Sequence, residues 1–191
     1  MSMVMTAAPA VEPVTLAQVK AHLRVDGTAE DAYIASLIAT SRLQIEAALG
    51  LALITQSWRW TIDDWPAGDT LELPIRPVQH ITSIEVTHAT GAATMVSPSS
   101  YHLDGRGLPP RIVLTTLPPP IPDLPADGIA ISMIAGFGGA AADVPEPIRH
   151  AVLLLVAHWF ENREPTEAGQ PTAGIPYAVN SLLMPYRVVR L

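Results

Sequence analysis

The 191-residue sequence contains no cysteine. Disulfide bonds, thiolate metal sites and cysteine nucleophiles are therefore excluded. Basic residues are also scarce, because 11 Lys and Arg stand against 18 Asp and Glu, and Lys20 is the single lysine. The formal net charge of −7 argues against a protein that grips nucleic acid through a broad basic face, although it leaves room for a local basic patch.

Long hydrophobic runs are missing as well. The longest uncharged apolar run in a helix-like segment, residues 151–157, is far shorter than the roughly 20 residues that a membrane-spanning helix needs. Residues 1–10 contain no basic region followed by an apolar run, so they do not predict a secretory signal. We expect no membrane partner.

Catalytic and metal-binding motifs are scarce too. None of the six histidines, at positions 22, 80, 88, 102, 150 and 158, has another at the i, i+4 spacing of a zinc-binding helix. No Gly-x-Ser-x-Gly elbow of a serine hydrolase occurs. Asp63 and Asp64 resemble the start of a carboxylate metal site, but the Trp-Pro-Ala-Gly that follows favours a turn at a strand end. The sequence predicts no enzyme activity, no metal and no cofactor.

Two features keep alternatives open. The glycine-rich residues 136–139 precede a predicted helix, as phosphate-binding loops do. They lack the dinucleotide-binding and P-loop spacings, so we favour a bend, with a small nucleotide-binding enzyme as the alternative. The indoles of Trp58, Trp60 and Trp159 are suited to stacking on bases, but the scarcity of nearby cations favours core packing.

Proline marks out the middle of the chain. Eleven of the 19 prolines lie between residues 66 and 125. Because proline removes a backbone donor and breaks helix interiors, this stretch must consist of strands, turns and loops, with an extended connection at residues 118–125. Apolar and alternating segments predict strands at residues 57–62, 71–73, 84–87, 111–114 and 129–135.

Helix signals stand on both sides of this region. Thr15 and Gln18 have the spacing of a capping box, and a second cap signal, Thr28 with Asp31, precedes an apolar stripe that ends at Gly50. These signals predict two helices joined by a short turn, an αα-hairpin.

A third helix is predicted after the proline-rich stretch. Asp143 and Glu146 have cap spacing, and a strong apolar stripe follows at helical spacing. A short apolar helix around residues 179–184 and an extended basic tail complete the pattern.

Together these signals predict an α+β fold that is mainly a helical bundle, a helical hairpin plus a long C-terminal helix, with a small antiparallel β-sheet inserted. The predicted parts are an N-terminal helical hairpin at 14–53, a proline-rich β insertion at 54–142, a core helix packing on the hairpin at 143–164, and a mobile loop and C-terminal docking tail at 165–191.

Several segments, taken in order, resemble one protein family. The run 14–25, Val-Thr-Leu-Ala-Gln-Val-Lys-Ala-His-Leu-Arg-Val, followed by Asp-Ala-Tyr-Ile at 31–34, is similar to the opening of the head–tail connector (adaptor) proteins of tailed bacteriophages and gene-transfer particles. Further matching segments lie at residues 55–58, 144–151, 158–164, 175–179 and 182–187. The resemblance spans nearly the whole chain.

The resemblance implies a non-enzymatic structural subunit without a cofactor. Such subunits form a ring, usually a dodecamer, between the capsid portal protein and a tail-side connector, stopper or terminator protein. DNA passes through the lumen without specific binding. The implied location is the head–tail junction of a virion or phage-like particle, after synthesis in the bacterial cytoplasm. A capsid-assembly chaperone that leaves the mature particle is the alternative.

The segment 175–191 is the candidate docking element. It holds two arginines and no acidic residue in an otherwise acidic chain, and its apolar residues suit addition of a strand to a partner sheet or the filling of grooves. The alternative is that it folds back on the core of its own subunit. The predicted portal-docking residues are Tyr177, Leu182, Leu183, Pro185, Tyr186, Arg187, Val188, Val189, Arg190 and Leu191.

Overall fold

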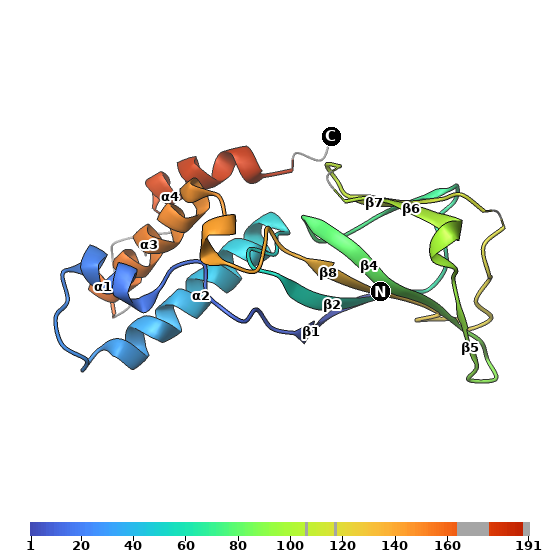
Figure 1. Ribbon diagram of the computed structural model, residues 1–191, viewed down its shortest axis with the longest axis horizontal. Helices are drawn as coiled ribbons and strands as arrows, with labels where there is room; N and C mark the ends of the chain where they lie inside the picture. The colour runs from blue at the N-terminus through green and yellow to red at the C-terminus, as the bar shows by residue number, and fades with distance from the viewer. Residues whose placement is uncertain (106, 117, 164–175, 189–191) are drawn as a thin grey trace, which may run out of the picture. The chain divides into compact units, whose positions relative to one another are not determined.

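The computed structural model describes residues 1–105, 107–116, 118–163 and 176–188 (Figure 1). The chain divides into two compact units. A β unit contains Met1–Ala10 and Thr55–Phe137, and a helical unit contains Val11–Ile54 and Gly138–Leu191. The chain therefore passes from one unit to the other three times.

The larger sheet of the β unit has five antiparallel strands in the order β1-β2-β8-β4-β5. Its central strand β8 reads Ile-Ala-Ile-Ser-Met-Ile-Ala, and five of these seven residues are buried. Such a continuous apolar run is typical of a strand covered on both faces. The bounds are Ser2–Ala7 for β1, Gln56–Ile62 for β2, Val78–Thr87 for β4, Ala93–Met95 for β5 and Ile129–Ala135 for β8.

The smaller sheet has three antiparallel strands in the order β3-β7-β6, which are Thr70–Glu72, Arg111–Leu114 and Tyr101–Asp104. The short helix η1 (Pro98–Ser100) leads into β6, and the Ser97 hydroxyl caps it. Large side chains from both sheets are fully buried and form the core of the unit: Ile62, Ile84, Ile112, Ile129, Ile131 and Met133.

Strand β1 was not expected from the sequence. It pairs antiparallel with β2, so that Met3 lies opposite Trp60 and Met5 opposite Trp58. Ser-Met-Val-Met-Thr-Ala carries no strong local strand signal, and its extended conformation depends on the hydrogen-bonding edge that β2 offers.

The helical unit begins with two helices whose ends follow local signals. Helix α1 (Leu16–Leu23) starts after Thr15, and the predicted capping box is confirmed: the Gln18 N–H donates to the Thr15 hydroxyl over 3.2 Å, and the Thr15 N–H donates to the Gln18 side chain over 2.8 Å. Helix α2 (Asp31–Leu49) ends at Gly50, whose positive φ of 63° confirms the predicted glycine cap.

Two other predicted caps were wrong. The N-cap of α2 is Glu30, which makes no side-chain cap bond. Helix α3 (Glu146–Glu161) starts after Pro145 with a second proline in its first turn. The Asp143 carboxylate instead accepts the N–H of Ala140 over 2.9 Å, around the short helix η2 (Ala141–Asp143). Proline provides the helical φ at this start, so no side-chain cap is needed.

The predicted fold class was also wrong. The structure is 34% helix and 26% strand, with sheets of five and three strands, so it is not mainly a helical bundle with a small inserted sheet. Local patterns predicted β2 and the second half of β4, and β7 and β8 have the predicted bounds. The sequence did not predict strands β1, β5 and β6, because these segments are short and lack a strong strand pattern. They become strands only by pairing with a neighbouring strand.

A buried ion cluster ties together three segments of the helical unit. The Arg42 side chain on α2 donates from Nε to Glu12 over 2.8 Å and from Nη1 to Glu46 over 2.8 Å. The other carboxylate oxygen of Glu46 accepts the Leu53 N–H over 2.8 Å. Burial by itself would lower the pKa of Arg42, but the hydrogen bonds and charges of Glu12 and Glu46 outweigh burial and raise that pKa.

Replacing Arg42→Ala should lower the free energy of unfolding by about 3 kcal/mol or more, because the buried Glu46 carboxylate would lose its salt bridge to the Arg42 guanidinium. Urea denaturation followed by circular dichroism measures this loss. Arg111→Ala is the matched control, since it breaks an exposed ion pair with Asp104 and should cost about 1 kcal/mol at most. Equal effects of the two variants would contradict a structural role for the buried cluster.

Candidate docking site

Helix α4 (Tyr177–Leu183) begins the described part of the candidate docking segment, and one face anchors it to α3 (Figure 1). Val179 and Leu183, one helical turn apart, are buried in the helical unit, and Leu183 is only 3% exposed. Tyr177, by contrast, is 86% exposed. The core of the helical unit therefore holds this helix in place, while the Tyr177 ring faces solvent.

The residues after α4 continue this outward face. In the short helix η3 (Met184–Tyr186), Met184 is 65% exposed. Arg187 then takes an extended conformation, and its guanidinium donates to the Asn180 side chain over 3.0 Å. Val188 is exposed. An apolar surface with one nearby cation results, and the Arg187 side chain ties it to Asn180 of α4.

The predicted docking residues thus divide into three groups. Leu183 belongs to the core of the helical unit and does not face outward. Leu182 and Tyr186 are half-buried, whereas the side chains of Tyr177, Pro185, Arg187 and Val188 are exposed. The predicted residues Val189, Arg190 and Leu191 lie outside the described residues.

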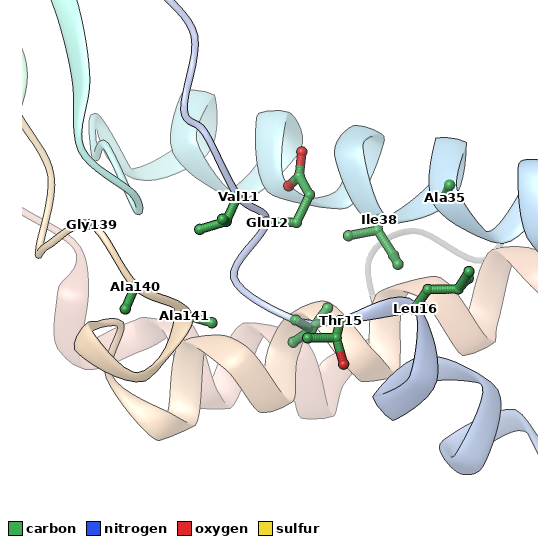
Figure 2. Close-up of a pocket in the computed structure, with 10 residues that line it drawn as sticks. Val11, Glu12, Thr15, Leu16, Ala35, Ile38, Gly139, Ala140 and Ala141 are labelled. Carbon is green, nitrogen blue, oxygen red and sulfur yellow. The ribbon is translucent and has the colours of Figure 1, made fainter.

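An apolar groove is the second candidate site (Figure 2). It has a volume of about 440 Å³ and lies within the helical unit, between the start of α1, part of α2 and the loop before α3. Glu12 is the one titratable residue in its lining, and the Arg42 side chain already binds that carboxylate. The lining residues are Val11, Glu12, Val14, Thr15, Leu16, Ala35, Ile38, Gly139, Ala140 and Ala141.

The glycine-rich stretch 136–139 has no feature of a phosphate-binding loop in the structure. The Gly136 carbonyl accepts the Gln79 side-chain amide over 2.9 Å within the β unit. In the helical unit, Gly138 lies against the Asp143 carboxylate, which also occupies the Ala140 N–H. A carboxylate at this position would repel a phosphate, so the bend interpretation is the one the contacts support.

The other sequence candidates have structural roles. Asp63 accepts the Asp127 N–H over 3.0 Å, and Asp64 accepts the Trp65 N–H over 2.8 Å, which confirms a turn. Trp60 is buried in the β unit. Trp58 and Trp159 are half-buried.

Across the described residues, no group of three or more His, Asp or Glu side chains is placed to hold a metal ion. No helix in the same part of the chain is both long and apolar enough to span a bilayer.

Comparison with known proteins decides the family. The family model of head completion proteins matches residues 12–189, almost the whole chain. The chain belongs to the head completion protein family.

Solved structures similar to this head completion family member come from gene transfer agent (GTA) particles. A chain in the neck of an empty GTA particle, computed with C6 symmetry, is 30% identical with a TM-score of 0.84. A chain in the virion of a native GTA particle is 28% identical with the same TM-score, and one in the native neck, computed with C12 symmetry, is 29% identical with a TM-score of 0.78. Each match covers 100% of this chain and 97% of the other. No curated protein matches.

These findings confirm the resemblance to head–tail connectors and make this head completion family member a structural protein, not an enzyme. Its predicted location, the head–tail junction of a virion or phage-like particle, agrees with the necks that contain the similar chains.

Sequence reasoning missed two groupings in this family member. The rings of His22 on α1 and His150 on α3 meet edge to face with centroids 6.4 Å apart, although the residues are distant in sequence. The Arg42 cluster was missed as well, and its one local signal was the i, i+4 spacing of Arg42 and Glu46.

The anchoring of α4 leads to a prediction. Leu183→Ala should increase hydrogen exchange across residues 177–183 and destabilise the docked helix by about 2 kcal/mol or more, because it leaves a cavity against α3. Tyr177→Ala, in the same helix, should change neither quantity appreciably, because that ring is exposed. Hydrogen exchange with mass spectrometry measures both, and a larger effect of the Tyr177 variant would refute this anchoring.

Proposed function

We propose that this protein is a head–tail connector subunit that assembles as a ring of twelve copies between the capsid portal protein and a tail-side protein. The observation that carries the proposal is the similarity, over the full chain, to proteins in GTA necks that were computed with C6 and C12 symmetry. DNA would pass through the lumen of this ring.

The charge balance supports a conduit. A ring of subunits that each carry a net charge of −7 would repel DNA phosphates overall, so it would form few phosphate contacts and DNA would pass without specific binding.

The docking surface for the portal is proposed to be the exposed part of the C-terminal segment. We define it as Tyr177, Leu182, Met184, Pro185, Tyr186, Arg187 and Val188, continued by Val189, Arg190 and Leu191. Its support is the concentration of exposed apolar side chains beside one cation on a helix that is itself anchored. Tyrosine and arginine often dominate binding energy at interfaces. Leu183 is left out because it is buried.

The double variant Tyr177→Ser and Met184→Ser should reduce attachment to capsids that lack this protein by about tenfold or more, because two exposed apolar anchors are lost. Quantitative mass spectrometry of reconstituted particles measures the number of bound copies. Leu108→Ser with Ile121→Ser is the matched control, since these side chains are equally apolar and exposed but belong to the β unit.

A second form of the docking test uses the tail itself. Deleting residues 185–191 should abolish attachment while leaving the melting temperature nearly unchanged, and reversing Arg187 and Arg190 to Glu should weaken it in a salt-dependent way. A truncated protein that still joins particles at normal occupancy would refute docking by the tail. If the unmodified protein were found on immature but not mature particles, the chaperone alternative would replace the connector role.

The isolated protein should be a monomer and form its ring only on the portal. Each subunit carries a charge of −7, so a closed ring sets like charges side by side, and a template must offset the repulsion. Size-exclusion chromatography with light scattering at moderate salt measures the mass. A stable ring without the portal would show that no template is required.

A further inference from the structure

The five-stranded sheet has two open edges. Strand β1 forms one edge and β5 the other, and within the described residues neither pairs with a further strand (Figure 1). An open edge presents unpaired N–H and C=O groups, which makes it a template for a strand of another chain. Soluble proteins commonly protect such edges with charges, prolines or bulges.

Neither open edge carries the usual protection. Residues 2–7 and residues 90–96 contain no charged side chain and no proline. The inner strands differ, because Arg59 on β2 and Glu85 on β4 form an ion pair over 3.1 Å. Two apolar side chains are exposed on the outer strands: Val4 on β1 is 57% exposed and Met95 on β5 is 59% exposed.

Bulges do not shield the open edge of β1 from pairing with another strand either. Its register against β2 is unbroken from Ser2 to Met5, and the single shift lies between Met5 and Ala7. By contrast, the part of β4 that extends beyond its pairing with β5 has register shifts at 78/80 and 81/83 against β8. Since bulges twist an edge away from a partner, the regular outer strands β1 and β5 are the available pairing sites.

We propose that the occupant of each edge is a second copy of this chain, with β1 of one subunit pairing with β5 of the next. This inference rests on the proposed ring. In a ring every subunit meets its two neighbours through two unlike surfaces, and a sheet with two different open edges supplies such a pair. Closing the ring would pair every edge, as closure does in a β-barrel.

The direction of the strands fits this arrangement. Each strand of the five runs antiparallel to its neighbour, so β1 and β5 run the same way. A rotation by one twelfth of a turn changes that direction little, so the strands of adjacent copies pair in parallel. The neutral edges also bring two subunits of charge −7 together where repulsion between side chains is least.

The small size of the pairing explains why it would need a template. Strand β5 has three residues and β1 has six, and so short a strand pair is at best marginally stable in water. Bound to adjacent portal sites, two copies meet at a much higher effective concentration, and the same contact then closes.

The test uses the absence of cysteine. The double variant Val4→Cys and Met95→Cys, assembled on capsids that lack this protein and treated with a short bismaleimide, should give a ladder of cross-linked copies on denaturing gels. Each single variant should give none, because β1 and β5 meet only each other. Val4→Cys with Ile121→Cys is the matched control, since Ile121 is equally exposed but outside both edges.

The outcomes separate this inference from the proposed function. Normal particle occupancy without a ladder would overturn the edge pairing alone, whereas failure of the unmodified protein to bind particles would overturn both. Dimers from Val4→Cys alone would also overturn it, because they would show β1 pairing with itself.

A second measurement needs no variant. Hydrogen exchange of the unmodified protein should slow by about tenfold or more at residues 2–7 and 93–95 when it is assembled on particles, because the edge amides gain partners. Unchanged exchange in both strands would overturn the pairing even if the cysteine variants failed to assemble.

Discussion

The buried ion cluster around the Arg42 guanidinium is the interaction that links the segments of the helical unit. The guanidinium binds Glu12, which lies just after the chain enters this unit, and Glu46, whose carboxylate also holds the Leu53 N–H just before the chain leaves it. Because a buried charge that loses its partner is costly, these contacts help to hold the three segments together. Helix α3 packs on the frame that α2 provides, and α4 packs on α3.

This order of packing determines what the protein offers to partners. Val179 and Leu183 fasten α4 to α3, so that Tyr177 and Met184 are presented from a fixed helix rather than a free tail. Glu12 is the one titratable residue in the lining of the apolar groove, and its carboxylate is already bound by the Arg42 side chain. Polar groups of the helical unit thus hold its own chain, while apolar side chains are exposed at the start of α4 and just after the helix.

The β unit obeys a different constraint. Its central strand β8 pairs with β2 on one side and with β4 on the other. The outer strands β1 and β5 each pair with a strand on one side only among the described residues. Neutral outer strands are a hazard for a free monomer but an advantage for a subunit that assembles beside copies of itself. In the two proposals made above, the helical unit supplies the surface for the portal and the sheet supplies the contact between neighbouring copies.

By itself, the sequence determined the features that depend on residues close together in the chain. The Thr15 capping box spans three residues, Gly50 needs only its own φ, and the continuous apolar run of β8 marks a buried strand. Tertiary structure decided the rest, because the deciding partner is remote: β1 is a strand only beside β2, and Arg42 reaches Glu12 across 30 positions. In the docking segment, Leu183 and Met184 are adjacent and equally apolar, yet only contact with α3 buries the first and leaves the second exposed.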